Sequence, residues 1–136
     1  MTSHPRNDVP WIKCVGELDF TDVMSYYEQS DALVFLSKAE SYGLPLIEAI
    51  WLGKPIVCPD LPYAHTICGD GAIYFDPDSF ASFARAIEVL DTTVPRGATQ
   101  DWSEQRKKFP NTWREVAQRF VDISNLAMAE EEGRIF

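Results

Sequence analysis

The chain has 136 residues, and its 12 Lys and Arg against 21 Asp and Glu leave a formal net charge of −9. Hydrophobic residues make up 46% of the chain, more than a disordered protein carries. This length suits one domain with a buried core. The acidic balance argues against binding to nucleic acid or to an anionic membrane surface, because both need a positive face.

The amino-terminal third of the chain predicts two strands with a helix between them. Residues 11–15 are an apolar run of strand length. Residues 21–29 have helical apolar spacing, and Tyr26 and Tyr27 within them are expected to be core residues. Residues 32–36 are apolar throughout, a pattern typical of a strand buried on both faces.

The middle of the chain continues this alternation. Residues 44–52 predict a helix with Pro45 in its first turn, where a missing N–H costs nothing. Residues 56–58 and 72–75 are apolar runs of strand length, and a brief helix over 64–68 lies between them.

The last part of the chain is predicted to be helical. The inner face of a helix over residues 79–90 is expected to be Phe80, Phe83, Ala84, Ile87 and Leu90. A linker over 91–100 precedes a short helix over 102–109 and a longer one over 112–128. The apolar stripe of the longer helix is Trp113, Val116, Ala117, Phe120, Ile123 and Ala127. We therefore expect a lobe over residues 1–100 and closing C-terminal helices over 101–136.

The alternation of strands and helices predicts the α/β class. Because the strands are apolar throughout, we expect a Rossmann-like parallel sheet with helices on both faces. Such sheets bind their ligands at the carboxyl ends of the strands, so we expect the binding residues to lie there.

Three cysteines, Cys14, Cys58 and Cys68, lie beside apolar residues and show no C-x-x-C spacing. An odd number of such thiols is typical of free cysteines in a reducing compartment. Residues 1–10 lack the apolar run of a signal peptide, and no run reaches the ~18 apolar residues of a membrane span. We therefore expect a cytoplasmic protein.

The segment between residues 36 and 53 joins a strand end, a loop and a helix start at the carboxyl edge of the predicted sheet. The loop ends at Gly43, and the helix opens at Leu44. The N–H groups and dipole of a helix amino end attract anions, and a glycine lets the backbone approach a phosphate closely. We therefore expect an anion site at this point.

Two carboxylates frame the predicted anion site: Glu40 in the loop, and Glu48 one turn inside the helix. One turn spans about 5.4 Å, and helical side chains lean toward the amino end. Carboxylates accept hydrogen bonds from vicinal hydroxyls. The arrangement therefore fits a ligand with a diphosphate between two polyols, as in a nucleotide sugar. The alternative is that both carboxylates are solvated surface groups.

The same segment resembles the E-x7-E signature of GT-B glycosyltransferases of the GT4 type, through Glu40, Glu48 and Gly43-Leu44-Pro45. Four further stretches are similar to motifs of that family, in the same order: Tyr26-Tyr27 with Ser30-Asp31, Gly53-Lys54-Pro55-Ile56-Val57, Cys68-Gly69-Asp70-Gly71-Ala72, and Phe75-Asp76-Pro77. The resemblance covers residues 12–90. It implies the carboxyl-terminal, donor-binding lobe of the GT-B fold, without the first strands of that lobe.

The resemblance also implies roles for individual residues. Glu40 is implied to be catalytic and to hold hydroxyls of the donor sugar near its anomeric centre, and Glu48 is implied to bind the ribose. The other implied donor-binding residues are the loop backbone at Ser41, Tyr42, Gly43 and Leu44, and Gly16, Glu17 and Leu18 beside the base.

The implied reaction is a retaining transfer of a hexose from a UDP- or GDP-linked sugar to a saccharide or another hydroxyl acceptor, as in polysaccharide biosynthesis. The family uses no metal and no cofactor for this step. Positive groups and the helix dipole stabilise the leaving diphosphate while the sugar gains oxocarbenium character.

Two parts of the family's enzymes have no counterpart in this sequence: the Arg and Lys that clamp the diphosphate, and the N-terminal acceptor lobe. We therefore expect the chain to bind a nucleotide sugar but to be inactive alone, with the acceptor lobe in the same longer chain or on a partner subunit of a split enzyme. That lobe is also where peripheral contact with the inner membrane is expected. The alternative is a non-catalytic interaction module that self-associates through its exposed sheet edge.

Three other features have less specific interpretations. Asp76-Pro77-Asp78 matches the metal-binding D-x-D pattern, but a helix cap formed by these residues is favoured. His65, in a proline-flanked segment, is favoured as incidental over a role as a general base. Lys38 and Lys54 are either solvated or compensate the charge of a diphosphate.

Overall fold

A computed structural model describes residues 9–112 and, beyond them, 114–115, 117–118, 121–122, 125–126 and 128–129. The chain divides into two compact units, Met1–Gln100 and Asp101–Phe136. The candidate site lies in the first unit.

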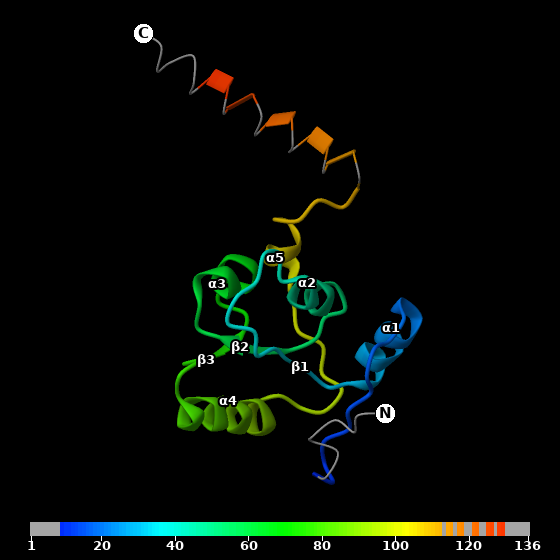
Figure 1. Cartoon of the computed structure of the whole chain (residues 1–136), viewed down its shortest axis with the longest axis vertical. Coiled ribbons are helices and arrows are strands. Elements are labelled where there is room, and N and C mark those ends of the chain that lie inside the picture. Colours follow the sequence, from blue (N-terminus) through cyan, green and yellow to red (C-terminus); the bar gives the residue numbers. More distant parts are fainter. Residues whose placement is uncertain are drawn as a thin grey trace. The chain divides into compact units, whose positions relative to one another are not determined.

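A parallel sheet of three strands forms the centre of the first unit (Figure 1). In spatial order the strands are β1 (Leu33–Val34), β2 (Ile56–Pro59) and β3 (Ile73–Phe75). Leu33 lies opposite Ile56, and Val57 lies opposite Ile73. The prediction of a Rossmann-like α/β fold with parallel strands is confirmed.

Helices cover both faces of this sheet. The helices of the first unit are α1 (Phe20–Gln29), α2 (Leu44–Trp51), α3 (Pro62–Cys68) and α4 (Phe80–Thr93). Figure 1 shows α2 and α3 on one side of the sheet and α4 on the other, where α4 packs on β2 and β3. This arrangement confirms the prediction of helices on both faces.

The core lies on both sides of β2, which is buried along its whole length. On one side, Val57, Phe75 and Ala86 form a cluster, and the rings of Phe75 and Phe83 pack edge to face at 5.1 Å. On the other side, the fully buried residues belong to α2 and α3: Leu46, Ala49, Ile50, Ala64 and Cys68. The core therefore holds α2 and the loop before it in place.

The prediction of a strand over residues 11–15 is wrong. The N–H of Ile12 bonds to the carbonyl of Val9 in a turn, and the segment forms no ladder with β1. Instead, a cavity of about 560 Å³ is lined by Lys13 and Val15 on one side and by β1 on the other. An apolar run becomes a strand only when a neighbouring strand lies within hydrogen-bonding reach, and here none does.

The predicted strand over residues 32–36 is present but shorter, as β1, and the prediction that it is buried on both faces is wrong. Only Leu33 and Val34 pair in the sheet, and the side chain of Val34 is 39% exposed. Leu36, two residues further on, is 59% exposed. The reason is that β1 lies at the edge of the sheet, while α4 packs chiefly on β2 and β3.

The inner face of α4 differs in part from its prediction. Phe83, Ile87 and Leu90 pack against the core as expected, but Phe80 and Ala84 are exposed, and Ala86 is the buried alanine. Phe80 lies in the first turn, where it lines a cavity with the loop that leaves β3. The sheet has ended at that point and does not cover its ring.

The second unit contains the short helix α5 (Ser103–Arg106), which is shorter than the predicted 102–109. The described residues between 114 and 129 are helical, and Ala117 among them is exposed. The other residues of the predicted stripe, Trp113, Val116, Phe120, Ile123 and Ala127, lie outside the described residues. Within the part of the chain that the structure describes, no helix has the length and apolar character needed to cross a membrane.

Candidate functional site

The loop from Ser37 to Gly43 leaves the carboxyl end of β1 and leads into α2. Gly43 caps α2 in the left-handed conformation, with φ 60° and ψ 42°. Its carbonyl accepts the N–H groups of Leu46 and Ile47, and Pro45 has no N–H. Among the described residues, no carbonyl takes up the N–H of Leu44, so this amide is the free donor of the first turn.

Gly43 also lies where two helices approach closely. A Cβ atom at this position would meet Cδ1 of Ile67, on α3, at 2.6 Å. Ile67 is itself buried, so it has little room to move. The glycine therefore serves both the backbone turn and the packing of α2 on α3.

Glu48 lies one turn inside α2 and is half-buried. Its Oε2 accepts a hydrogen bond from the hydroxyl of Tyr27, on α1, at 3.0 Å. The same hydroxyl lies 3.1 Å from the carbonyl oxygen of Pro45. Burial, and then the hydrogen bond and charge of Glu48, raise the pKa of Tyr27 above its ordinary value. The carboxylate is thus held by a neutral donor from a neighbouring helix.

Tyr27 was predicted only as a core residue, so its contact with Glu48 was missed. Its helical spacing from Val23 indicated a half-buried ring, and a buried tyrosine hydroxyl usually finds a hydrogen-bond partner. That signal indicated that a partner existed. It did not indicate which one, because Tyr27 and Glu48 are 21 residues apart and meet only when α1 packs beside α2.

Glu40 lies in the exposed part of the loop. The hydroxyl of Tyr63, on α3, donates to the carbonyl of Ser37 and so holds the start of the loop. Burial, with the nearby thiol of Cys58 and the charge of Glu40, raises the pKa of Tyr63. The two glutamates therefore have separate surroundings: Glu40 is close to α3, and Glu48 is bound from α1.

The raised tyrosine pKa values lead to an expected loss of stability in alkali. Burial is the main cause of the raised pKa of Tyr27, Tyr63 and Tyr74. The fold therefore favours the neutral phenols, and their contribution to stability is complete below the unfolded pKa of about 10 and is lost as the pH rises toward the folded values. We expect Tm to be level between about pH 8 and 9 and to fall by about pH 11.

The measurement is thermal unfolding followed by circular dichroism across that pH range. Tyr74→Phe provides the comparison, because its hydroxyl donates to the carbonyl of Gly69 and one titrating group is then removed. This variant should be less stable at neutral pH but lose less stability in alkali. A Tm that holds or rises up to about pH 11 contradicts the assignment.

The other residues of the predicted donor site have mixed placements. Ser41, Tyr42 and Leu44 are exposed around the buried Gly43. Gly16 and Glu17 are also exposed, and Leu18 lines the same cavity as Tyr27. Another cavity, of about 210 Å³, is lined by residues of α1 and by residues along the whole length of α2; Glu48 is its one charged residue, and the others are Phe20, Met24, Leu44, Ile47, Trp51 and Leu52.

The two candidate cations lie at opposite ends of the sheet. Nζ of Lys38 pairs with Oδ1 of Asp78 at 2.7 Å, and both side chains are exposed beside the carboxyl ends of the strands. Lys54 precedes β2 and donates to the carbonyl of Ser30 at 2.9 Å. Lys54 is therefore at the amino ends of the strands, and Lys38 lies in the loop itself.

The segment Asp76-Pro77-Asp78 does not supply the cap of α4, so that part of the prediction is wrong. The cap is Ser79, whose hydroxyl accepts from the N–H of Ser82 at 3.1 Å. Oδ1 of Asp76 instead accepts from the N–H of Asp78 at 2.9 Å and closes a turn. A serine one residue later has the extended backbone that a cap needs, so the aspartates turn the chain and pair with Lys38.

His65 and Cys68 belong to α3, and Cys58 belongs to β2. Nε2 of His65 lies 2.5 Å from Oδ1 of Asp60, and its ring stacks on that of Tyr74 at 3.9 Å. Cys58 and Cys68 are free and buried, and the hydrogen bond between them, with burial, raises the pKa of Cys58. Among the residues that the structure describes, no three His, Cys, Asp or Glu side chains form a group suited to a metal ion.

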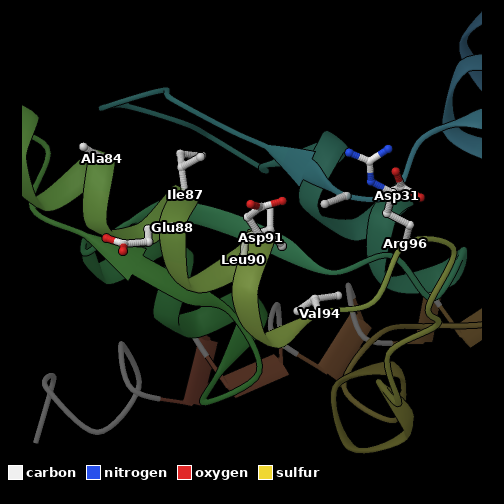
Figure 2. Close-up of a pocket in the computed structure, with 9 residues that line it drawn as sticks. Asp31, Ala84, Ile87, Glu88, Leu90, Asp91, Val94 and Arg96 are labelled. Carbon is white, nitrogen blue, oxygen red and sulfur yellow. The ribbon is translucent and has the colours of Figure 1, made fainter.

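Another cavity, of about 520 Å³, lies apart from this site, between α4 and the start of β1 (Figure 2). Its apolar side is formed by Ile87, Leu90 and Val94, and Asp31 and Arg96 lie at one end. Asp31 precedes β1 and accepts from the N–H of Gly97 at 2.7 Å. The cavity is therefore at the amino end of β1, whereas Glu40 follows its carboxyl end.

Comparison with known proteins gives a consistent set of relatives. A family model described as "Glycosyl transferases group 1" matches residues 11–109. The chain is 33% identical over 75 residues to the O-antigen chain mannosyltransferase RfbU of Salmonella typhimurium. This matched stretch covers 55% of this chain and 21% of that protein. It is 38% identical over 101 residues to the serotype-specific mannosyltransferase WbdA of Escherichia coli, which covers 71% of this chain and 11% of that protein.

A third relative matches a longer stretch of the chain. The O-antigen chain mannosyltransferase B of Escherichia coli is 25% identical over 118 residues, which covers 85% of this chain and 30% of that protein. The chain thus spans between 11% and 30% of the length of these relatives. No solved structure matches it.

Proposed function

Because the chain belongs to the group 1 glycosyltransferases, we propose that it is the donor-binding part of a retaining GT4-type enzyme with the GT-B fold. The substrate is a nucleotide-diphosphate sugar, and the product is a glycoside of a saccharide or another hydroxyl acceptor. The observation that carries the proposal is the half-buried carboxylate of Glu48, held by Tyr27 beside the amino end of α2. That geometry supports binding of ribose and diphosphate next to each other.

The chemistry of the site supports each part of such a ligand. The free N–H of Leu44 and the dipole of α2 attract the diphosphate and stabilise it as a leaving group, with no metal ion needed for that role. Glu48 accepts the ribose hydroxyls. Glu40, on the exposed loop, binds the hydroxyls of the sugar and stabilises positive charge at its anomeric carbon. Lys38 lies in the loop itself, where its ion pair with Asp78 offsets part of the positive charge that it could offer a phosphate.

The relatives favour mannose as the transferred sugar and a bacterial surface polysaccharide as the product. All three are named mannosyltransferases, and two are named for the O-antigen chain. The proposed donor is therefore a GDP- or UDP-linked hexose. The acceptor is bound by a further lobe, in a longer chain or on a partner subunit, at the cytoplasmic face of the inner membrane. Alone, the chain should bind the nucleotide weakly and transfer nothing.

Calorimetric titration of the chain with GDP and UDP tests the donor site. We expect binding of one nucleotide at millimolar concentration and a loss of about 10-fold or more in Glu48→Ala, because a hydrogen bond to a charged group is removed. Glu88→Ala is the matched control, since Glu88 is an exposed helical glutamate at the cavity of Figure 2. The proposal fails if neither nucleotide binds, or if the two variants behave alike.

A second function, as an interaction module, is favoured by one observation. Val34 on the edge strand β1 is 39% exposed, beside a cavity of about 560 Å³. An edge strand with free N–H and C=O groups is a template for pairing with another chain. Light scattering at increasing concentration separates the functions: self-association that Val34→Lys abolishes supports the module, and a monomer that binds GDP or UDP supports the enzyme.

A further inference from the structure

We propose that Tyr27 is a positioning residue of the donor site, whose hydroxyl fixes the carboxylate of Glu48 for the ribose hydroxyls of the nucleotide. The inference rests on the proposed function. It adds a residue outside the E-x7-E segment, and on a different helix, to the machinery that binds the donor.

The hydroxyl of Tyr27 lies between the side chain of Glu48 and the backbone of the same helix. Its oxygen lies 3.0 Å from Oε2 of Glu48 and 3.1 Å from the carbonyl oxygen of Pro45. One proton is therefore shared between the side chain of Glu48 and the backbone of the first turn of the same helix. This sharing fixes where the carboxylate lies relative to the amino end of α2, where the diphosphate is expected.

The contact with Tyr27 leaves most acceptor sites of the Glu48 carboxylate available to a ligand. An ionised carboxylate has two oxygens and about four acceptor sites. Tyr27 contacts Oε2, and no described residue donates to Oε1. A pair of vicinal hydroxyls can therefore bind the remaining positions of a carboxylate that is already oriented. A glutamate left unheld would lose side-chain rotamer freedom when the ligand fixed it, and binding would be weaker for that reason.

Glu48 lies in largely apolar surroundings. The cavity of about 210 Å³ beside it is otherwise lined by apolar side chains. A carboxylate in such surroundings needs a hydrogen-bond donor, and a neutral phenol supplies one without cancelling the negative charge. Because burial and Glu48 both raise the pKa of Tyr27, the phenol keeps its proton throughout the neutral range. The donor is thus present whenever the enzyme works.

Tyr27 lies between two parts of the proposed ligand site. Its side chain lines the same cavity as Leu18, the residue expected beside the base. Its hydroxyl, at the other end, reaches Glu48. Tyr26, the adjacent tyrosine, is 40% exposed and has no described contact with Glu48. The pair therefore offers one tyrosine for the test and one for its control.

The experiment titrates GDP or UDP, whichever the chain binds, and its 2′-deoxy counterpart into four variants: Tyr27→Phe, Glu48→Ala, the double variant and Tyr26→Phe. Tyr27→Phe is expected to weaken binding of the ribonucleotide by about 3- to 10-fold. It should affect the deoxynucleotide less, and it should add nothing in the Glu48→Ala background. Tyr26→Phe should bind like the unaltered chain. Tm is measured for each variant, because loss of the Pro45 contact lowers stability whatever the role in binding.

Each outcome decides between the two proposals. If the unaltered chain binds neither nucleotide, the proposed function and the inference fail together. If Glu48→Ala weakens binding and Tyr27→Phe does not, the inference is wrong and the proposed function stands. If Tyr27→Phe weakens both nucleotides equally, or still weakens binding in the absence of Glu48, then Tyr27 only supports the fold and the inference is again wrong.

Discussion

Replacement of Gly43 with alanine is expected to destabilise the chain by about 3 kcal/mol and to lower Tm by roughly 10 °C. Two effects add. The residue has φ 60°, a conformation that costs a residue with a Cβ about 1–2 kcal/mol. The new Cβ would also lie 2.6 Å from Cδ1 of Ile67, which must move within a packed region. The measurement is chemical denaturation with Tm as a second readout.

Gly97→Ala is the matched control for this prediction. Gly97 has φ 73°, so alanine meets a similar backbone cost there, but nothing lies within 4 Å of the added Cβ. We expect Gly97→Ala to cost about 1–2 kcal/mol. The difference between the two variants therefore measures the contact of α2 with α3. Equal losses would show that Ile67 moves freely and that the close approach is unimportant.

Gly43→Ala is also expected to weaken nucleotide binding, even at temperatures where the variant is folded. A shift of Ile67 or of α2 displaces the free N–H of Leu44 and the first turn that Tyr27 contacts. The affinity for GDP or UDP should fall by about 10-fold, the effect of losing one charge-assisted hydrogen bond. Binding that matches the Gly97→Ala variant would contradict the placement of the diphosphate at this helix end.

Leu46→Ala is expected to have a comparable or larger effect on stability, about 2–5 kcal/mol. The side chain of Leu46 is fully buried, one turn from Gly43 in sequence, and belongs to the layer that α2 packs against α3. Removing it leaves a cavity that the surrounding side chains fill only in part. The measurement is the free energy of unfolding from urea denaturation.

Leu44→Ala is the control, because the same atoms are removed from the same helix at a side chain that is 60% exposed. Its cost is expected to stay within about 0.5 kcal/mol. If the two leucines cost the same, α2 is not anchored by its buried face. The fold would then depend instead on the contacts of Tyr63 with the loop and of Tyr27 with α2.

Local rules of the sequence predicted most elements of the lobe. Pro45 in a first turn predicted the start of α2, and the structure begins that helix at Leu44, with Gly43 as its left-handed cap. The short runs at β2 and β3 became strands because each has a parallel neighbour. The run over residues 11–15 has a similar composition but no neighbour within reach, so the same rule failed there.

Exposure at the sheet edge could not be predicted in the same way. An apolar run shows that a strand favours burial, but the number of its covered faces depends on which helices pack over it. Val34 is exposed because β1 is a strand at the edge of the sheet. Phe80 is exposed because the sheet ends before the first turn of α4. Both facts depend on the arrangement of elements, which is not contained in any window of sequence.

The sequence by itself determined that the chain is an α/β lobe and that Glu40 precedes a helix that contains Glu48, because apolar runs of strand length and the glycine and proline at a helix start are local properties. The tertiary structure decided the surroundings of these carboxylates. Glu48 is bound by a tyrosine 21 residues away, whereas Glu40 lies near α3. Contacts between separate helices depend on how the core packs, and so only the folded chain shows which hydroxyl holds which carboxylate.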